Sequence, residues 1–145
     1  MSSSSLSARV VRATVGPEPS LAESVAEVAD PRAGCVATFV GWVRDHDHGR
    51  EVERLEYSAH PSASLRLAEL AAEVAQRPGL VAISVQHAVG DLQIGGVAVV
   101  AAVSAEHRGQ AFEACHLLVD RLKAEVPIWK HQIFTDGDDE WVGIP

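Results

Sequence analysis

The chain has 145 residues, of which 47% are hydrophobic and 22% are charged. This composition is typical of a soluble globular protein, and a chain of this length buries about 70% of the surface that its unfolded form exposes, which favours one domain with one core. The formal net charge of −8 repels nucleic acid and anionic lipid. The sequence therefore argues against general binding to either.

The first residues, MSSSS, have neither a basic start nor an apolar run behind them, so they do not form a secretory signal. No stretch approaches the roughly 18 apolar residues that a membrane-spanning helix needs, and we expect a cytoplasmic protein. Cys35 and Cys115 lie within apolar stretches, which is typical of reduced thiols in a core. We expect residues 1–7 to be a disordered tail and residues 8–145 to form a single domain.

The first part of the chain contains two strand-like runs with a helix between them. β-branched residues are frequent from 6 to 15, and a Gly-Pro turn closes this first strand. Ser20 and Glu23 have the spacing of a capping box, which predicts a short helix that ends near Asp30. The nearly continuous apolar run 34–44 predicts a strand buried on both faces.

A polar loop and a longer helix follow. The loop covers residues 44–50 and leads into a strand over 51–58. Apolar residues recur at helical spacing from 61 to 77, and Pro78-Gly79 ends this helix.

The last part of the chain predicts two more strands, a helix and a final strand. The apolar runs 80–88 and 97–105 are typical of a hairpin-type pair with a long connection. An amphipathic helix over 109–125 ends before Pro127, and a short strand over 128–134 follows. The order βαββαββαβ predicts an α+β or mixed α/β fold.

Lysine is rare in this chain. Ten of the twelve basic residues are arginines, and the only lysines are Lys123 and Lys130. A lysine amine can be tuned towards neutrality and an arginine cannot, so lysine suits a site that requires a compact amine; the alternative is two ordinary surface charges. Lys123 falls in the last helical turn, where a cation also offsets the helix dipole. Lys130 follows Pro127, so the intervening turn is able to bring both amines to one cleft.

Two other polar segments are candidates for binding. The loop RDHDHGR superficially suggests metal ligands, but no second cluster of Cys or His completes a tetrahedral set, so we favour a mobile cationic rim around Arg44 that receives an anion. His107-Arg108 lies where a helix begins and backbone N–H groups attract anions, although such a pair also serves simply to bond the backbone there. These cationic positions suit an anionic small molecule.

Three long stretches resemble one known family. They are residues 37–61, 103–132 and 136–142, which have the sequences ATFVGWVRDHDHGREVERLEYSAHP, VSAEHRGQAFEACHLLVDRLKAEVPIWKHQ and DGDDEWV. In order and spacing they resemble the large, catalytic subunit family of molybdopterin synthase.

The resemblance implies an α/β hammerhead fold with an additional antiparallel β subdomain, and a central homodimer. It implies that each end of the dimer binds a small ubiquitin-like subunit, whose Gly-Gly tail carries a terminal thiocarboxylate into a pocket, giving a heterotetramer. The implied reaction moves two sulfurs from that tail to cyclic pyranopterin monophosphate and forms the dithiolene of molybdopterin, for the molybdenum cofactor. No metal or cofactor of its own is implied.

The resemblance also assigns substrate-binding residues. The family's phosphate- and pterin-binding segment falls on Trp42, Val43 and Arg44. A second substrate-binding pair falls on His107 and Arg108, which are expected to reach the pocket across the dimer interface.

The family's two active-site lysines fall on Lys123 and Lys130, with His131 and Gln132 beside the second as substrate-binding residues. Both substrates are anions, so a preorganised cationic pocket is needed to offset their repulsion. We expect Lys123 to be the main group for proton transfer or charge stabilisation, and Lys130 to support it and orient the substrate.

One departure from the family concerns the C-terminal end. Family members commonly continue past the final Trp-Val pair into a polar tail that supplies another arginine, whereas this sequence ends with residues 143–145. That arginine is dispensable, or another such as Arg50 replaces it, or activity is reduced.

Two alternative functions are a non-catalytic module that docks a ubiquitin-like tail and a metal-binding protein built on His46 and His48.

Overall fold

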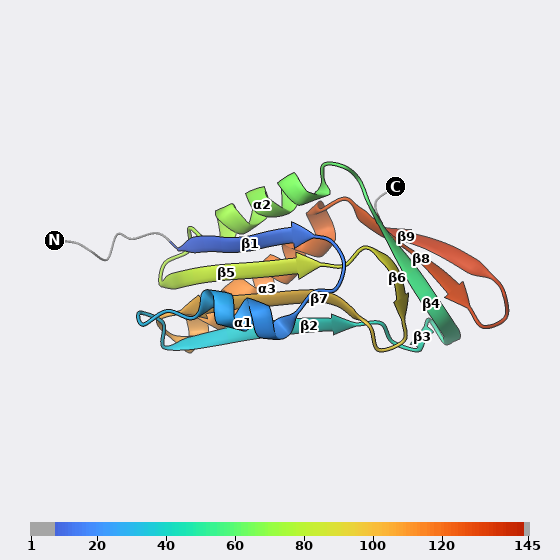
Figure 1. Cartoon of the computed structure of the whole chain (residues 1–145), viewed down its shortest axis with the longest axis horizontal. Helices are drawn as coiled ribbons and strands as arrows, with labels where there is room; N and C mark the ends of the chain where they lie inside the picture. The colour runs from blue at the N-terminus through green and yellow to red at the C-terminus, as the bar shows by residue number, and fades with distance from the viewer. Residues whose placement is uncertain (1–7, 144–145) are drawn as a thin grey trace.

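A computed structural model describes residues 8–143, so the predicted tail at 1–7 lies outside the described residues. Within them, three helices and nine strands follow one another in the order β1-α1-β2-β3-β4-α2-β5-β6-β7-α3-β8-β9 (Figure 1). The predicted mixed α/β class is confirmed.

The first sheet has four strands in the order β1-β5-β7-β2. These are β1 (Arg9–Val15), β5 (Leu80–His87), β7 (Val97–Ala105) and β2 (Cys35–Trp42). β1 runs parallel to β5, while β5 and β2 both pair antiparallel with β7. The predicted pairing of the two apolar runs 80–88 and 97–105 is confirmed.

Helices cover both faces of this sheet. α1 (Leu21–Val28) lies on one face, in front of the sheet in Figure 1, and α2 (Ala63–Val74) and α3 (Arg108–Glu125) lie on the other. The main core lies between the sheet and α2 and α3, whereas a smaller cluster lies under α1. β5 is buried along its whole length because it is a central strand with helices on both sides.

The prediction that residues 34–44 form a strand buried on both faces is wrong. β2 lies at the edge of the sheet, and its side chains include Val36 at 41% exposure and Trp42 at 71%. Cys35, Ala37 and Phe39, on one face of β2, pack against the main core. An apolar run shows that a segment belongs to a sheet, but its position in the sheet depends on the other strands.

The second sheet is antiparallel throughout, which confirms the additional antiparallel subdomain. Its strands are β3 (His46–Asp47), β4 (Arg50–Ala59), β8 (Ile128–Phe134) and β9 (Asp139–Gly143), with β6 (Gly90–Gln93) paired to β4. Figure 1 shows these strands gathered at one end of the molecule, beyond the ends of β2 and β7.

The sequence did not predict β3, β6 or β9, which are short and polar. The segment predicted as a mobile polar loop, residues 44–50, instead contains a tight hairpin in which Asp47 pairs with Arg50. The two residues between them, His48 and Gly49, have φ angles of 50° and 79°. Positive φ at both central residues is the geometry that joins antiparallel strands directly.

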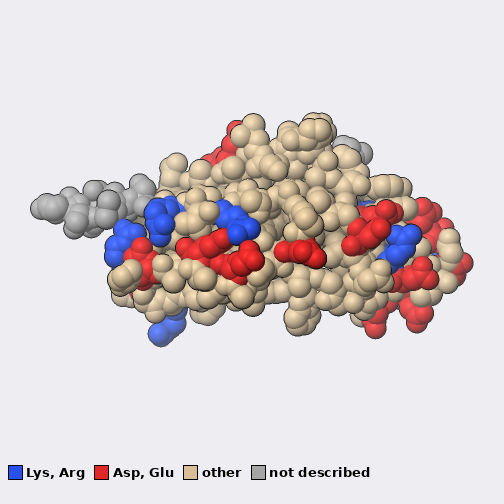
Figure 2. All heavy atoms as spheres, in the orientation of Figure 1, with Lys and Arg blue, Asp and Glu red and all other residues tan. Residues whose placement is uncertain are grey.

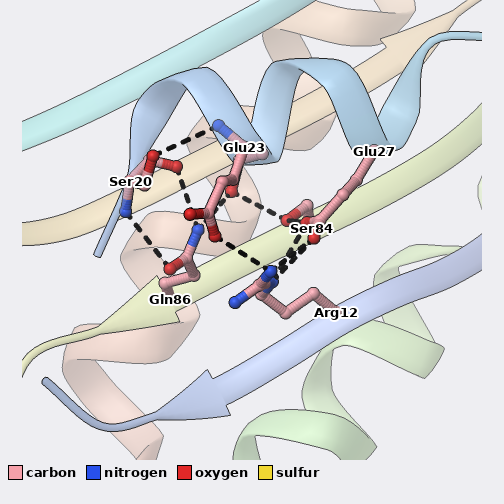
Figure 3. Close-up of polar contacts among 7 residues, drawn as sticks. Arg12, Ser20, Glu23, Glu27, Ser84 and Gln86 are labelled. Atoms are coloured by element: carbon pink, nitrogen blue, oxygen red, sulfur yellow. Dashed lines mark hydrogen bonds and ion pairs between the residues drawn. The ribbon is translucent and has the colours of Figure 1, made fainter. Parts of the chain in front are cut away.

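A chain of polar contacts fixes α1 on the first sheet (Figure 3). The Nε2 group of Gln86 donates to the Oγ atom of Ser24 at 2.7 Å, and Ser24 lies 2.8 Å from Ser84, whose hydroxyl donates to Glu27 at 2.9 Å. Because Ser84 uses its proton on Glu27, Ser24 must donate to Ser84. Arg12 on β1 closes the chain by binding Glu27, and this bond holds the pKa of the Glu27 carboxyl below its usual value.

Candidate active site

The two lysines line one cleft, of about 210 Å³, where the two sheets meet. The elements around it are the end of β5, the last turns of α3, and parts of β4, β8 and β9. Its lining residues are Tyr57, His87, Leu122, Lys123, Val126, Ile128, Lys130, Val142 and Gly143.

Local chain geometry brings the lysines together. α3 ends at Glu125, because Val126 has extended backbone angles (φ −87°, ψ 125°) and Pro127 follows. The chain then enters β8, where Lys130 lies between Tyr57 of β4 and Val142 of β9. Neighbouring residues on adjacent strands share a face, so Lys130 lies on the cleft side of the sheet with these two residues.

Among residues 8–143, the lysines of this cleft differ from most of the arginines in having no direct ion pair. Eight of the ten arginines form ion pairs with carboxylates: Arg9, Arg12, Arg32, Arg44, Arg50, Arg54, Arg66 and Arg121. Within residues 8–143, Lys123 and Lys130 have neither an ion pair nor a hydrogen bond through their side chains. A partly apolar cleft with two free ammonium groups is suited to an anion, because charges interact more strongly away from bulk water.

The sequence predicts a mobile cationic rim around Arg44. In the structure Arg44 is exposed but is paired with a carboxylate. Its Nη2 group donates to Asp47 at 3.1 Å, and the other oxygen of Asp47 accepts from Gln132 at 2.7 Å. The bond from Gln132, with smaller contributions from His48, Arg44 and Lys130, keeps the pKa of Asp47 below its usual value. Arg44 is therefore joined through Asp47 to β8, on the strand face that Lys130 also occupies.

Trp42 and Val43, the other two residues of the predicted substrate-binding segment, differ strongly in solvent exposure. Trp42 is 71% exposed at the end of β2. Val43 is buried at 4% exposure, and its N–H donates to Gly96 while its carbonyl accepts from Gly95. Val43 thus anchors the turn before β7, and Trp42 is the side chain of the two that a ligand or partner can contact.

His131 lies on the opposite face of β8 from Lys130. Its ring stacks on Trp141 at 4.3 Å between centroids, and its two nitrogens lie 3.0 Å from Glu56 and 2.6 Å from Asp139. The bond to Asp139, supported by Glu56, raises the pKa of His131. Although adjacent in sequence to Lys130, His131 does not line the lysine cleft.

His107 and Arg108 are remote from the cleft within one chain. His107 is the N-cap of α3, where its N–H donates to Gln110 at 3.1 Å, and Arg108 is the first residue of the helix. At 1.5 Å per residue, α3 separates Arg108 from Lys123 by about 22 Å. The structure of one chain therefore does not bring this pair to the lysines.

Arg50, one candidate to replace the family's tail arginine, does not line the lysine cleft. Its guanidinium binds Asp136 and Asp138, each at 3.0 Å, and lies 3.9 Å from the centroid of the Phe134 ring. These contacts hold the side chain of Arg50, the first residue of β4, against the tip of the β8–β9 hairpin.

Tyr57 and His87 also line the cleft, although the sequence did not predict them as site residues. His87 is the last residue of the buried strand β5, and Tyr57 lies near the end of the partly buried strand β4, so neither belongs to a recognisable motif. The two histidines of the 44–50 segment pair with neighbouring carboxylates, His46 with Asp45 and His48 with Asp47. In the described part of the chain, no three His, Cys, Asp or Glu side chains converge on a possible metal position.

A comparison with protein families decides the assignment. The family model described as MoaE protein matches residues 16–125, which is most of the chain. The chain belongs to the MoaE family. Its enzymatic role is in molybdenum cofactor biosynthesis, since its relatives include molybdopterin synthase catalytic subunits. No helix among the described residues is long and apolar enough to cross a membrane.

Relatives within this MoaE family are similar over most of their length. A molybdopterin synthase catalytic subunit from Mycobacterium tuberculosis is 42% identical over 125 residues, which cover 86% of this chain and 84% of the relative. One from Bacillus subtilis is 40% identical over 120 residues, covering 82% and 76%. The crystal structure of molybdopterin synthase from Staphylococcus aureus has a TM-score of 0.78 and 34% identity, and covers 95% of this chain and 97% of that chain.

Proposed function

We propose that this chain is the catalytic subunit of a molybdopterin synthase and acts as a sulfurtransferase. Two sulfurs move from the thiocarboxylated Gly-Gly end of a small ubiquitin-like subunit to cyclic pyranopterin monophosphate. The observation that carries this proposal is the cleft in which the chain's only two lysines meet without partners. The family membership and the names of the relatives support the same reaction.

The partner and the assembly are part of this proposal. A protein–protein complex of subunits 1 and 2 of molybdopterin-converting factor from Helicobacter pylori has the same fold, with a TM-score of 0.71 at 19% identity over 92% of this chain and 90% of that chain. We infer a heterotetramer in the cytoplasm, built on a homodimer in which residues 8–145 of each copy form one domain. A second copy is needed because His107 and Arg108 are too far from the lysines of their own chain.

Each lysine has a distinct proposed role. The cleft accepts the anionic tail, and Lys123 transfers protons or stabilises the charge that develops as sulfur attacks carbon. Lys130, which lies on β8, orients the substrate. Arg44, Trp42 and the partner copy's counterparts of the α3 N-terminal pair hold the phosphate and pterin around the cleft.

The contacts of the remaining predicted residues support mainly positional roles for them. Gln132 has its amide nitrogen committed to Asp47, His131 faces away from the lysines, and Val43 has its backbone groups paired. We therefore propose that these three residues maintain the walls of the site.

A reconstituted assay tests the reaction. Purified chain, thiocarboxylated small subunit and cyclic pyranopterin monophosphate are mixed, and the dithiolene product is followed. Lys123→Ala is expected to lower turnover by at least about 100-fold, as is typical when an acid–base group is removed. Arg77→Ala is the matched control, because Arg77 is exposed and distant from the cleft lining.

The same assay separates catalysis from docking. If wild-type protein binds the small subunit tightly but forms no product, the chain is a docking module and the proposal is wrong. Equal turnover in Lys123→Ala and Arg77→Ala would remove Lys123 from the chemistry.

A further inference from the structure

His87 is a buried histidine on the wall of the lysine cleft. It is the last residue of β5 and is 6% exposed. Along β5 it shares a face with Ile83 and Val85, which belong to the main core beside α2 and α3. Its imidazole is therefore directed to the side of the sheet on which Lys123 lies.

Hydrogen bonding determines which nitrogen of His87 is free. Nδ1 lies 2.7 Å from the carbonyl oxygen of Ala88, and a carbonyl only accepts, so Nδ1 carries the proton. Nε2 of the neutral ring is then an acceptor without a partner among the described residues. Every fully buried side-chain nitrogen among the described residues has a hydrogen-bond partner, so an Nε2 atom without one is not fully buried. It is therefore accessible from a cavity that His87 lines.

Tyr57 fixes the orientation of this ring. The two ring centroids are 4.8 Å apart at an interplanar angle of 89°, an edge-to-face contact between β5 of the first sheet and β4 of the second. Together with the Ala88 bond, this contact leaves the imidazole little freedom. A preorganised acceptor thus stands at the junction of the two sheets.

The charges around His87 favour its neutral form. Burial lowers the pKa of His87, the nearby charge of Lys123 lowers it further, and the bond to Ala88 partly opposes both effects. Tyr57 and Lys130 face it from the other walls of the cleft. Arg12, Glu18 and Glu23 line a second cavity that His87 also borders, of about 300 Å³, on the side of β1 and α1.

We propose that His87 is a positioning residue. No hydrogen bond joins His87 and Lys123 among the described residues, but both side chains line the same cleft. A change in the side-chain rotamer of Lys123 lets Nε2 of the neutral imidazole accept a hydrogen bond from the ammonium and hold that amine in the cleft. A carboxylate in this place would orient the amine but cancel its charge, whereas a neutral acceptor leaves the cleft cationic for an anionic substrate. Protonation of His87 breaks the bond and adds a third positive charge beside Lys123 and Lys130. The catalytic consequence rests on the proposed function, but the placement of Lys123 does not.

The scarcity of lysine allows a direct spectroscopic test. Reductive methylation with ¹³C-formaldehyde gives one dimethylammonium signal for each lysine, apart from that of the α-amine, and each retains its charge and one N–H donor. Lys130→Arg assigns the signals. The Lys123 signal is expected to shift with an inflection below pH 6.5 in the wild type and to lose this inflection in His87→Gln. An unchanged inflection in His87→Gln overturns the proposal.

Turnover provides the second readout. His87→Phe keeps a ring against Tyr57 but removes the acceptor, and is expected to lower kcat by roughly 10- to 100-fold, the size of effect that a displaced reactive group produces. His87→Gln restores an acceptor and is expected to recover most of kcat and to lose the acid limb of the pH profile. Wild-type kcat in His87→Phe contradicts the proposal. If wild-type protein forms no product while its Lys123 signal follows His87, the proposed function fails and the positioning stands.

Discussion

Neighbouring residues on β8 have opposite surroundings because side chains alternate across a strand. Lys130 faces the cleft, His131 faces Trp141 and the carboxylates of Glu56 and Asp139, and Gln132 returns to the face of Lys130. Gln132 is 2% exposed, and its amide bridges Asp47 of β3 to Glu140 of β9. Gln132, which the resemblance assigns to substrate binding, thus connects β8 to β3 and β9 in this chain.

Gln132→Ala is expected to lower the free energy of unfolding by about 1–3 kcal/mol, because it removes the donor to a mostly buried carboxylate of Asp47. Urea unfolding measures the change. Gln93→Ala on β6 is the control, since Gln93 is exposed and surface substitutions of this kind change stability by less than about 0.5 kcal/mol. Equal midpoints for the two variants would show that the bridge to Asp47 has no net effect.

At the scale of elements, β9 depends on β8 for its place. It is short and exposed along its whole length, yet Val142 and Gly143 form one wall of the cleft. His131 holds it through the bond to Asp139 and the stack on Trp141. A flexible β9 would open the cleft, so this histidine affects the site from the opposite face of the sheet.

The attachment of β9 is expected to weaken as pH rises. The folded-state pKa of His131 is raised above its usual value of 6.5, so its contribution is complete below the unfolded pKa and is lost as pH rises through the folded pKa. Hydrogen exchange of residues 139–143, corrected for intrinsic rates, should become faster from pH 6 to pH 9 relative to that of β7. His131→Phe keeps a stacking ring and should show no such change; the same pH trend in that variant would exclude His131 as its cause.

At the scale of the whole molecule, negative charge prevails while the site is positive. Figure 2 shows acidic side chains gathered over the end of the molecule that holds the second sheet. Asp136, Asp138 and Asp139 are exposed there. Because exposed charges are screened over about 8–10 Å at physiological salt, two lysines in a partly enclosed cleft are able to attract an anion despite the net charge of −8.

Phosphate is therefore expected to stabilise the folded chain through this cleft. A ligand at 100 times its Kd adds about 2.7 kcal/mol to the free energy of unfolding, which a thermal melt detects as a higher Tm. Lys123→Gln/Lys130→Gln should abolish the increase, whereas Arg77→Gln should retain it, with chloride at equal ionic strength as the reference. A phosphate effect that survives in the double variant would place the anion elsewhere.

Local patterns predicted the main helices and strands correctly because caps, helical spacing and apolar runs depend on residues close in sequence. The same reasoning brought Lys123 and Lys130 together, since only a helix end and one proline separate them. It failed for β3, β6 and β9, which are short polar strands stabilised by pairing with β4 or β8. Tyr57 and His87 were missed because they come from different sheets and have no shared motif.

The sequence alone determined the mixed α/β class, the resemblance to the MoaE family, and the presence of two lysines at the turn after α3. Only the tertiary structure decided that β2 is an edge strand, that His131 faces away from the cleft, and that His107 and Arg108 lie at the far end of α3. It also placed His87 beside Lys123. The physical reason is that strand order, strand face and cleft walls arise from contacts between distant segments, whereas residue pattern reports the preferences of neighbours along the chain.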